Sequence, residues 1–162
     1  MSTSTSHPAV DRVRTALVAE GAVSAADGIR WFDEAATTAA AAAHALSVEA
    51  GAIANSLVFT LDDQPLLVLT SGAHRVDTAF LGDRLGGRVG RAPKELVKEA
   101  TGQVIGGVAP LGHPAPVRTV VDVALAGFDV VWAAAGHART VFPTSFDELV
   151  RITGGEPSPV TP

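Results

Sequence analysis

Glycine and proline gather in one stretch of the 162-residue chain and could form a ligand-binding loop. Half of the 16 glycines lie between Gly82 and Gly112, and the densest piece, residues 102–114, also holds Pro110 and Pro114. Glycine lets the backbone approach a ligand closely, and proline lowers the entropy that a loop loses on binding. An isolated cluster of this kind is more often a structural turn. It matches neither a Walker phosphate loop nor a dinucleotide fingerprint.

The polar side chains give no sign of a metal centre or of a covalent mechanism. The absence of cysteine excludes disulfides, Cys-ligated zinc, iron–sulfur clusters and cysteine nucleophiles. No Gly-x-Ser-x-Gly elbow marks Ser56 or Ser71 as a nucleophile. Three histidines and two aspartates match no metal-ligand spacing, so surface or structural roles are favoured, and we expect no metal or cofactor. These residues are His74, His113, His137, Asp77 and Asp129.

Charge is distributed unevenly along the chain. The formal net charge is −5, which argues against an overall basic protein built for nucleic acid. Residues 73–98 nevertheless carry six cations and three carboxylates, and they immediately precede the glycine-rich stretch. This segment is either an ordinary solvated helical face or a patch for a phosphate backbone. Its cations are Arg75, Arg84, Arg88, Arg91, Lys94 and Lys98. Aromatic residues make up only 5%, which argues against an aromatic base-stacking platform.

Hydrophobic spacing and capping residues predict a mixture of helices and strands. Pro93 and Gly102 bracket a helix, and Ser145 with Glu148 has the spacing of a capping box. Residues 62–65 are turn-forming and join two apolar runs, which predicts a β-hairpin. The predicted helices span residues 9–19, 38–46, 76–85, 93–101 and 145–152. The predicted strands span residues 28–33, 56–61, 66–70, 128–134 and 139–142.

This order is not a regular alternation of strands and helices, so we expect a single α+β domain with a mixed sheet. The domain is expected over residues 7–154, with flexible ends at residues 1–6 and at the proline-rich residues 155–162. No apolar run is long enough to span a membrane and no secretory signal opens the chain. A cytoplasmic location without membrane contact is therefore expected.

Several segments, in their order and spacing, resemble one known family over roughly residues 7–154. They are residues 7–8, 51–59, 67–72, 75–77, 92–102, 106–113, 135–137 and 146–150. Together they resemble the YbaK/EbsC family of aminoacyl-tRNA editing domains, which are related to the insertion domain of bacterial prolyl-tRNA synthetase. The resemblance implies a mixed sheet curled into a partial barrel and surrounded by helices. It also implies a free-standing deacylase that hydrolyses the ester of a mischarged tRNA in trans.

The family's Gly-x-x-x-Pro loop maps onto Gly106, Gly107, Val108, Ala109 and Pro110, whose backbone is implied to place the ester and a water molecule. Catalysis would then depend on positioning and electrostatic stabilisation rather than on a covalent intermediate. The resemblance further implies a transient contact with the aminoacyl-tRNA 3′ end through the basic segment. An aminoacyl-tRNA synthetase is a candidate partner, and the oligomeric state is left open.

Asn55 and Ser56 are the expected polar contacts of the pocket, with His113 and His137 at its rim. Asn55 stands where active members of the family commonly carry a lysine. An amide supplies hydrogen bonds but no charge. The replacement of this lysine by Asn55 allows three interpretations. It weakens catalysis, it redirects catalysis to another aminoacyl group, or it marks a member without editing activity. Such a member would bind tRNA, a nucleotide or a partner protein. The sequence leaves these alternatives open.

Overall fold

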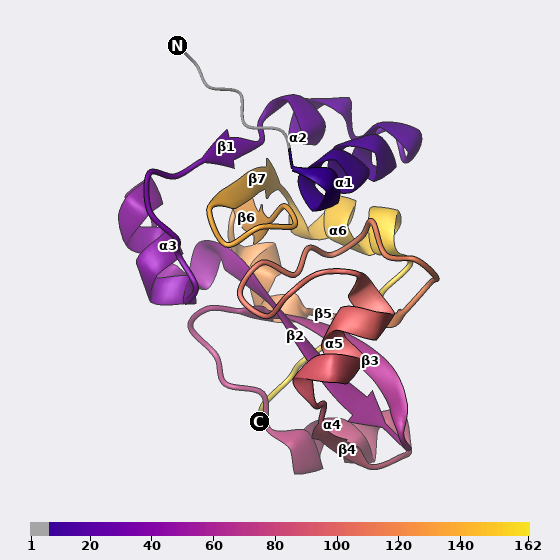
Figure 1. Ribbon diagram of the computed structural model, residues 1–162. Coiled ribbons are helices and arrows are strands. Elements are labelled where there is room, and N and C mark those ends of the chain that lie inside the picture. Colours follow the sequence, from indigo (N-terminus) through magenta and orange to yellow (C-terminus); the bar gives the residue numbers. More distant parts are fainter. Residues whose placement is uncertain (1–6) are drawn as a thin grey trace.

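The computed structural model describes residues 7–162 and shows an α+β domain built on one mixed sheet (Figure 1). The strands lie in the order β1-β7-β6-β2-β3-β5-β8, and β4 pairs with β2 outside this path. The sheet is curled and not closed, which confirms the expected fold class. The strands are β1 (Arg30–Trp31), β2 (Ile53–Leu61), β3 (Gln64–Ser71), β4 (Val89–Arg91), β5 (Arg118–Asp122), β6 (Val131–Ala134), β7 (Thr140–Thr144) and β8 (Glu156–Ser158).

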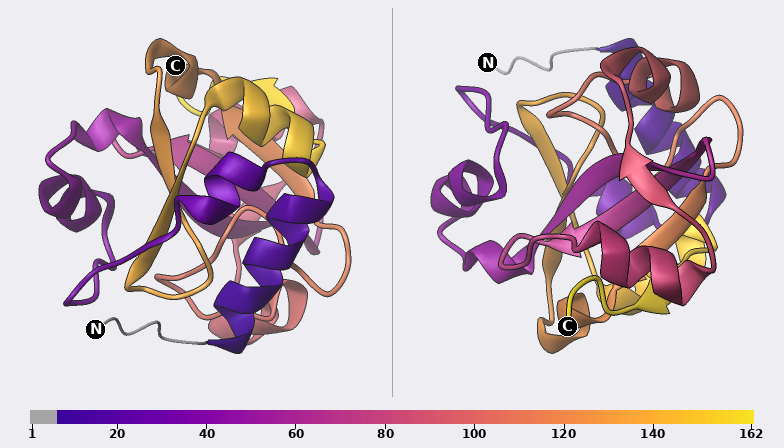
Figure 2. Two further views of the ribbon diagram at one scale, coloured as in Figure 1. Left: turned by 90° about the horizontal axis from the view of Figure 1, so that it is seen from above. Right: turned by 90° about the horizontal axis from the view of Figure 1, so that it is seen from below.

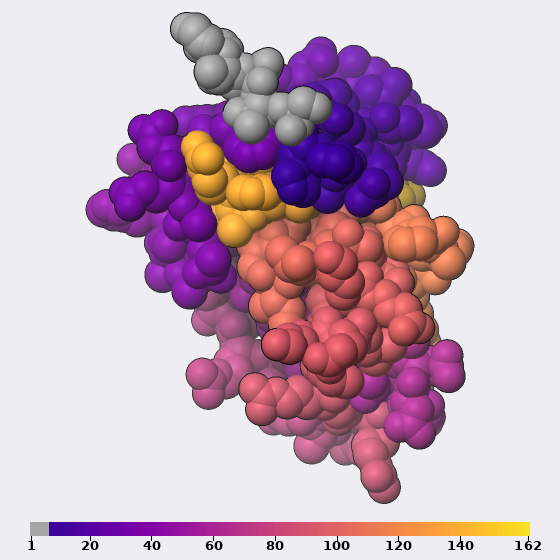
Figure 3. Space-filling view, viewed as in Figure 1, coloured from indigo at the N-terminus to yellow at the C-terminus, as the bar shows by residue number. Residues whose placement is uncertain are grey.

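Five of the six α-helices of the described chain lie around this sheet in three places. Figures 1 and 2 show α1, α2 and α6 near one another, α3 by itself at one side, and α4 beside β4 at the opposite end. The loop that follows α5 occupies the middle of the face seen in Figure 3, beneath the N-terminal helices. No helix among residues 7–162 is long and apolar enough to cross a lipid bilayer. The helices are α1 (Pro8–Ala19), α2 (Val23–Asp27), α3 (Ala39–Leu46), α4 (Thr78–Leu85), α5 (Lys94–Thr101) and α6 (Phe146–Thr153), with short 3-10 turns at Ala50–Ala52 and Val123–Gly127.

Strand β2 is the centre of the sheet, because it pairs with three other strands. On one side it pairs with β3 from Ala54 to Leu61. On the other side β6 pairs with its first two residues, Ile53 and Ala54, and β4 pairs with its last three, residues 59–61. Within the described chain, residues 55–58 therefore have no strand partner on that second side. The sheet is therefore interrupted at this point, and Asn55 and Ser56 belong to the unpaired stretch.

The elements with the strongest local signals form as predicted. The predicted hairpin forms, and it closes through Asp62 and Asp63, whose φ angles of 49° and 69° are those of a type I′ turn. The turn is shorter than the expected residues 62–65, because Gln64 and Pro65 already pair within β3. Helix α5 ends at Gly102 with φ 72°. Ser145 caps α6, because its Oγ accepts a hydrogen bond from the Glu148 backbone N–H at 3.1 Å. The Glu148 Oε1 accepts from the Thr144 hydroxyl at 2.6 Å, so the predicted capping box forms only in its Ser145 half.

Other predictions need correction. The strand expected over residues 28–33 pairs only at Arg30 and Trp31, and the strand expected from residue 128 begins at Val131. Helix α2 and strands β4 and β5 were not predicted. Residues 155–162, expected to be a flexible end, contain β8, which pairs with β5, and Val160, which is fully buried. Pairing and burial order this proline-rich segment. The predicted flexible residues 1–6 lie outside the described part of the chain.

The core inside the curled sheet is apolar and continuous. It joins Val13 and Leu17 of α1, Leu69 of β3, Phe142 of β7 and Leu149 of α6, and each of these side chains is fully buried. Fully burying such a side chain contributes about 1.5–3 kcal/mol. This core supports the strands whose edge is open at residues 55–58.

One buried carboxylate ties three segments together behind this core. Asp122 is fully buried at the end of β5. Its Oδ2 accepts a hydrogen bond from the Ser71 backbone N–H and lies 3.0 Å from the His74 Nδ1, and its Oδ1 accepts one from the Ala124 N–H at 2.9 Å. Asp122 thus joins the end of β3, the following turn and the 3-10 turn after β5.

We predict that Asp122→Ala lowers the free energy of unfolding by about 3 kcal/mol, because it leaves buried N–H groups without an acceptor. The measurement is urea denaturation followed by circular dichroism. The exposed carboxylate Asp129 provides the matched control. Asp129→Ala should change the stability by less than about 0.5 kcal/mol. Equal effects of the two substitutions would contradict this role of Asp122.

Candidate functional site

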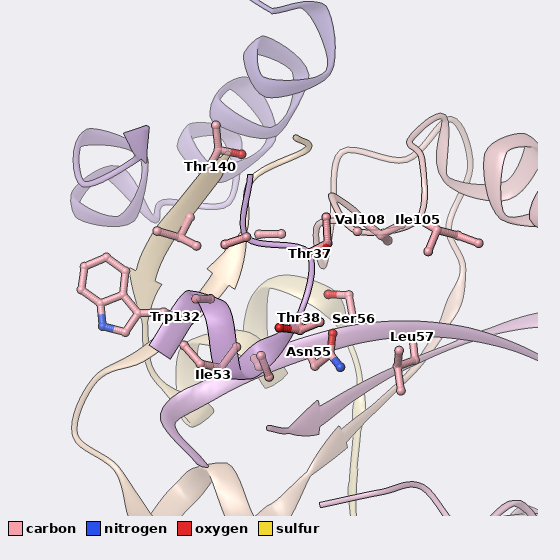
Figure 4. A pocket seen from close by; sticks show the side chains of 17 residues that line it. Thr37, Thr38, Ile53, Asn55, Ser56, Leu57, Ile105, Val108, Trp132 and Thr140 are labelled. Carbon is pink, nitrogen blue, oxygen red and sulfur yellow. The ribbon is translucent and has the colours of Figure 1, made fainter. Parts of the chain in front are cut away.

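A pocket of about 220 Å³ lies where β2 is unpaired (Figure 4). Asn55 and Ser56 of β2 line it, and so do Gly106 and Val108 of the glycine-rich loop. The parting of the sheet therefore brings together the two segments that the sequence singled out, although they are some fifty residues apart. Figure 4 shows Thr37 and Thr38, from the segment that leads into α3, beside them.

The pocket is lined by uncharged residues only. No Asp, Glu, Lys, Arg or His is among its described lining residues, although polar groups are frequent there. Helix α3 contributes only alanines to the wall, among them the buried Ala42, and Trp132 of β6 lies at one end. Small side chains on α3 leave space that larger ones would fill. Within residues 7–162, no three His, Asp or Glu side chains gather in a way that could hold a metal ion.

The glycines of the loop are required by close packing. Gly106 has φ 98°, a conformation that favours glycine, and it lies directly beside the side chain of Thr37. Gly107 lies directly against the backbone of the turn between β6 and β7. A Cβ placed on Gly107 would lie 2.8 Å from backbone atoms of His137 and Ala138. The loop can occupy this position only with glycine there.

The side chains of Gln103 and His113 fix the second half of the loop by hydrogen bonds to the backbone of Ala109. The Ala109 N–H donates to the Gln103 Oε1 at 2.6 Å. The Ala109 carbonyl oxygen lies 2.8 Å from the His113 Nε2, which donates to it. Both polar groups of this peptide backbone are therefore satisfied by side chains from within the same loop. Such a loop presents its remaining peptide groups in a fixed orientation.

Ser56 carries a polar atom that the protein leaves unused. Its Oγ is buried and has no hydrogen-bond partner within the described chain. A buried hydroxyl without a partner is costly, so such groups are usually paired with water or a ligand. Asn55 lies next to it on the pocket side of β2 (Figure 4). The pair supplies hydrogen-bonding groups without charge.

Comparison with known proteins identifies the family. The model of the aminoacyl-tRNA editing domain matches residues 33–152 of this chain. The chain belongs to the aminoacyl-tRNA editing domain family. The resemblance recognised from the sequence segments is thereby confirmed.

Individual relatives agree with this assignment of the editing domain. A solved structure, described as that of a proposed trans-editing enzyme for prolyl-tRNA synthetase, superposes with a TM-score of 0.89 and 35% identity over 96% of this chain and 98% of that one. The uncharacterized protein YwhH of Bacillus subtilis (strain 168) is 29% identical over 119 residues, which are 73% of this chain and 76% of that protein. The proline–tRNA ligase of Lactobacillus acidophilus is 29% identical over 126 residues, which are 71% of this chain but only 22% of the ligase.

The two histidines expected at the rim of the editing-domain pocket do not line it. His113 lies behind the loop, in a hollow between the loop and α1, where it holds Ala109. His137 lies in the turn against which Gly107 packs, and its ring contacts those of His7 and Trp31. Its Nδ1 accepts a hydrogen bond from the Arg139 N–H at 3.0 Å. Both histidines thus support the loop from outside the pocket.

The six predicted cations of the editing domain separate into two groups. Arg91 lines a hollow of about 210 Å³ that shares Ser56 and Val108 with the pocket. Lys94 and Lys98 line the hollow beside Ile105, the exposed tip of the loop. The remaining three lie on the α4 side and line none of these hollows. They are Arg75, Arg84, whose Nε donates to the Ser158 Oγ at 3.0 Å, and Arg88.

The sequence reasoning missed the residues that bound the pocket from the N-terminal side. The segment before α3 is fastened to the β6–β7 turn, because the Phe32 N–H donates to the Arg139 carbonyl and the Ala36 N–H to the Ala138 carbonyl. This fastening places Thr37 over Gly106. The one available signal was the pair Thr37 and Thr38 at the start of the helix predicted over residues 38–46, since either could cap it. The cap is Thr38, whose Oγ1 accepts from the Ala41 N–H at 3.0 Å. Gln103 gave no signal, because its role depends on a contact within an irregular loop.

Burial lowers the pKa of His113 and outweighs the Ala109 hydrogen bond, which raises it. Burial, followed by the charges of His7 and Arg139, lowers the pKa of His137 as well. The unfolded chain then binds more protons than the folded one as the pH falls through about 6.5, the ordinary pKa of histidine. The contribution of these neutral histidines to the free energy of unfolding is complete above that pH and is lost as the pH falls below it.

We predict that His113→Gln reduces the loss of stability between pH 7 and pH 5, measured by thermal unfolding at each pH. The substitution removes a group that must become protonated on acid unfolding. His44 is exposed on α3 and serves as the control position. His44→Gln should leave the pH profile unchanged. A His113→Gln profile parallel to that of the unmodified protein would contradict the prediction.

Proposed function

We propose that this editing domain hydrolyses, in trans, the ester that links a wrong amino acid to the 3′-terminal adenosine of a tRNA. The observation that supports this most is the pocket in which Gly106 and Val108 of the loop line the same space as Asn55 and Ser56. The family assignment and the relation to a proline–tRNA ligase give the substrate class. The reaction would take place in the cytoplasm, where charged tRNAs are used.

The proposed mechanism uses water as the nucleophile. The pocket offers no cysteine, and its described lining has hydroxyl groups but no histidine, lysine or carboxylate that could activate one as a nucleophile, so we propose no covalent intermediate. The fixed peptide groups of Gly106, Gly107 and Val108 would hold the ester in a reactive orientation. The Ser56 hydroxyl, which lacks a partner in the described chain, would bond to the substrate or to the attacking water. Such positioning can supply a large part of a rate enhancement.

The size of the pocket supports a sieve for small aminoacyl groups. Ala39 and Ala42 of α3 bound the pocket, so an aminoacyl side chain that fits beside them would be accepted and one that overlaps this wall would be rejected. The apolar part of the wall cannot distinguish strongly between similar small side chains. We therefore expect hydrolysis of several small aminoacyl esters rather than of one.

A second candidate function follows from Asn55. No cation is among the described residues that line the pocket, although active family members commonly place a lysine at this position. Without that charge, the domain would bind the tRNA end, a nucleotide or a partner protein without hydrolysing an ester.

The main prediction concerns deacylation of a panel of tRNAs that carry small, wrong amino acids. We expect the protein to release at least one of them, and we expect Gly107→Ala to slow release about a hundredfold, because the added Cβ displaces the loop. Gly127→Ala is the matched control, since a Cβ there meets nothing within 4 Å. Released amino acid is measured over time. A folded protein that releases none of them would overturn the enzymatic proposal.

The Asn55→Lys variant separates the two candidate functions in the same assay. Activity in the unmodified protein favours the deacylase. Activity that appears only after Asn55→Lys would show that the natural protein is a binding member, because the added cation alone restores catalysis.

We further propose that the tRNA acceptor end lies along Arg91, Lys94 and Lys98, which line the two hollows that adjoin the pocket. Two carboxylates, Glu95 and Glu99, line the hollow of the lysines as well. A synthetase that supplies the mischarged tRNA is a candidate partner. The contact is expected to be transient, because few cations surround the pocket.

Replacing Arg91 and Lys98 by glutamine should weaken tRNA binding and flatten its dependence on salt by about 0.7–0.9 in log–log slope for each phosphate that is no longer neutralised. The pair Arg75→Gln and Arg88→Gln removes the same charge on the α4 side and should have the smaller effect. Binding is measured by fluorescence anisotropy at several salt concentrations. Equal weakening by the two pairs would refute the proposed position of the tRNA.

A further inference from the structure

Gln103 is almost completely buried, with 2% of its surface exposed, and it belongs to no described hollow. Its Oε1 accepts the hydrogen bond from the Ala109 N–H. The N–H can only donate, so the amide oxygen must face it, and this fixes the orientation of the side-chain amide. The Gln103 Nε2 is then left buried without a partner within residues 7–162.

An unpaired buried amide destabilises a protein, and an apolar side chain of the same size would avoid that cost. The benefit that Gln103 brings is the hydrogen bond to Ala109. This bond does more than stabilise one residue, because it sets the orientation of a whole peptide group. The next peptide group, between Ala109 and Pro110, is oriented by the hydrogen bond from His113 to the Ala109 carbonyl.

The peptide group between Val108 and Ala109 is planar and trans, so its C=O and N–H point in opposite directions. Since the N–H points at Gln103, the Val108 carbonyl points away from it. Val108 lines the pocket, and its carbonyl accepts no hydrogen bond from any described backbone N–H. The Val108 carbonyl is therefore an acceptor without a described backbone donor, on a residue that lines the pocket.

We propose that Gln103 is a positioning residue that turns the Val108 carbonyl toward the pocket, where this carbonyl binds the α-ammonium group of the aminoacyl ester. An ammonium group has three donors and a positive charge, so it forms strong hydrogen bonds with carbonyl oxygens. The pocket has no carboxylate among its described lining residues, which leaves neutral acceptors to hold the cation. This inference rests on the proposed deacylase function and adds the group by which the substrate is held.

The test compares two esters that differ only at the α-position. One is the aminoacyl-tRNA that the protein hydrolyses fastest, and the other is its α-hydroxyacyl counterpart, made from it with nitrous acid. Each enzymatic kcat/KM is divided by the rate of the uncatalysed hydrolysis, because the ammonium group also activates the ester chemically. We expect the corrected preference for the aminoacyl ester to be about tenfold or more, as for a hydrogen bond to a charged group.

The Gln103→Met variant keeps the volume but removes the acceptor that holds Ala109. We expect it to reduce the corrected preference at least about fivefold, mainly through the aminoacyl ester. Thr119→Val is the matched control, because it removes one buried side-chain hydrogen bond, to the Val117 carbonyl, outside the pocket. This control should keep the preference, whereas a merely structural role of Gln103 would lower both rates equally. An unchanged preference in Gln103→Met overturns the proposal.

Failure of the proposed function is distinguishable from failure of this inference. If neither ester is hydrolysed by the folded protein, binding replaces turnover as the readout. The probes are stable amide analogues, 3′-alanylamido-3′-deoxyadenosine and its lactyl counterpart, titrated into protein labelled with ¹³C at valine carbonyls. Tighter binding of the alanyl analogue with a shift of the Val108 carbonyl signal supports the inference. Equal affinity of the two analogues overturns it.

Discussion

The pairing of β2 with three different strands is the constraint on which the rest of the site depends. Strand β3 occupies one side of it, while β6 and β4 share the other side and leave residues 55–58 between them. A continuous partner there would fill the space with another strand. Strand β6 pairs in parallel with the start of β2 and β4 pairs antiparallel with its end, so the two do not meet along β2. The glycine-rich loop lies against the gap that results.

The loop is fixed by packing and hydrogen bonds that lie outside the pocket. Gly107 lies against the turn before β7, and Gln103 and His113 hold the two sides of Ala109. None of these contacts needs a ligand, so the peptide groups facing the pocket keep their orientation when it is empty. Recognition by such groups depends on geometry rather than on charge, since the surrounding lining is neutral. A site organised in this way before binding loses little entropy when the ligand arrives.

The sequence predicted what local interactions decide. Residues a few positions apart decide the hairpin, the glycine end of α5 and the caps at Thr38 and Ser145. Strands β4, β5 and β8 are short and are ordered by partners far away in the chain, so no local pattern marked them. The family resemblance predicted that Asn55 and Ser56 share a pocket with the glycine-rich loop. It did not predict the role of Gln103 or the positions of His113 and His137 outside the pocket, because these depend on how an irregular segment packs.

Strand β8 affects how readily two copies of the molecule associate. It covers the edge of β5, and such an edge, if left bare, is a template for pairing with another chain. Pro157 lies within β8 and Pro159 follows it, and neither has an N–H to donate. The sheet therefore ends at a strand that cannot readily take another partner. The same prolines that made this segment look unstructured in sequence protect the domain against edge-to-edge aggregation.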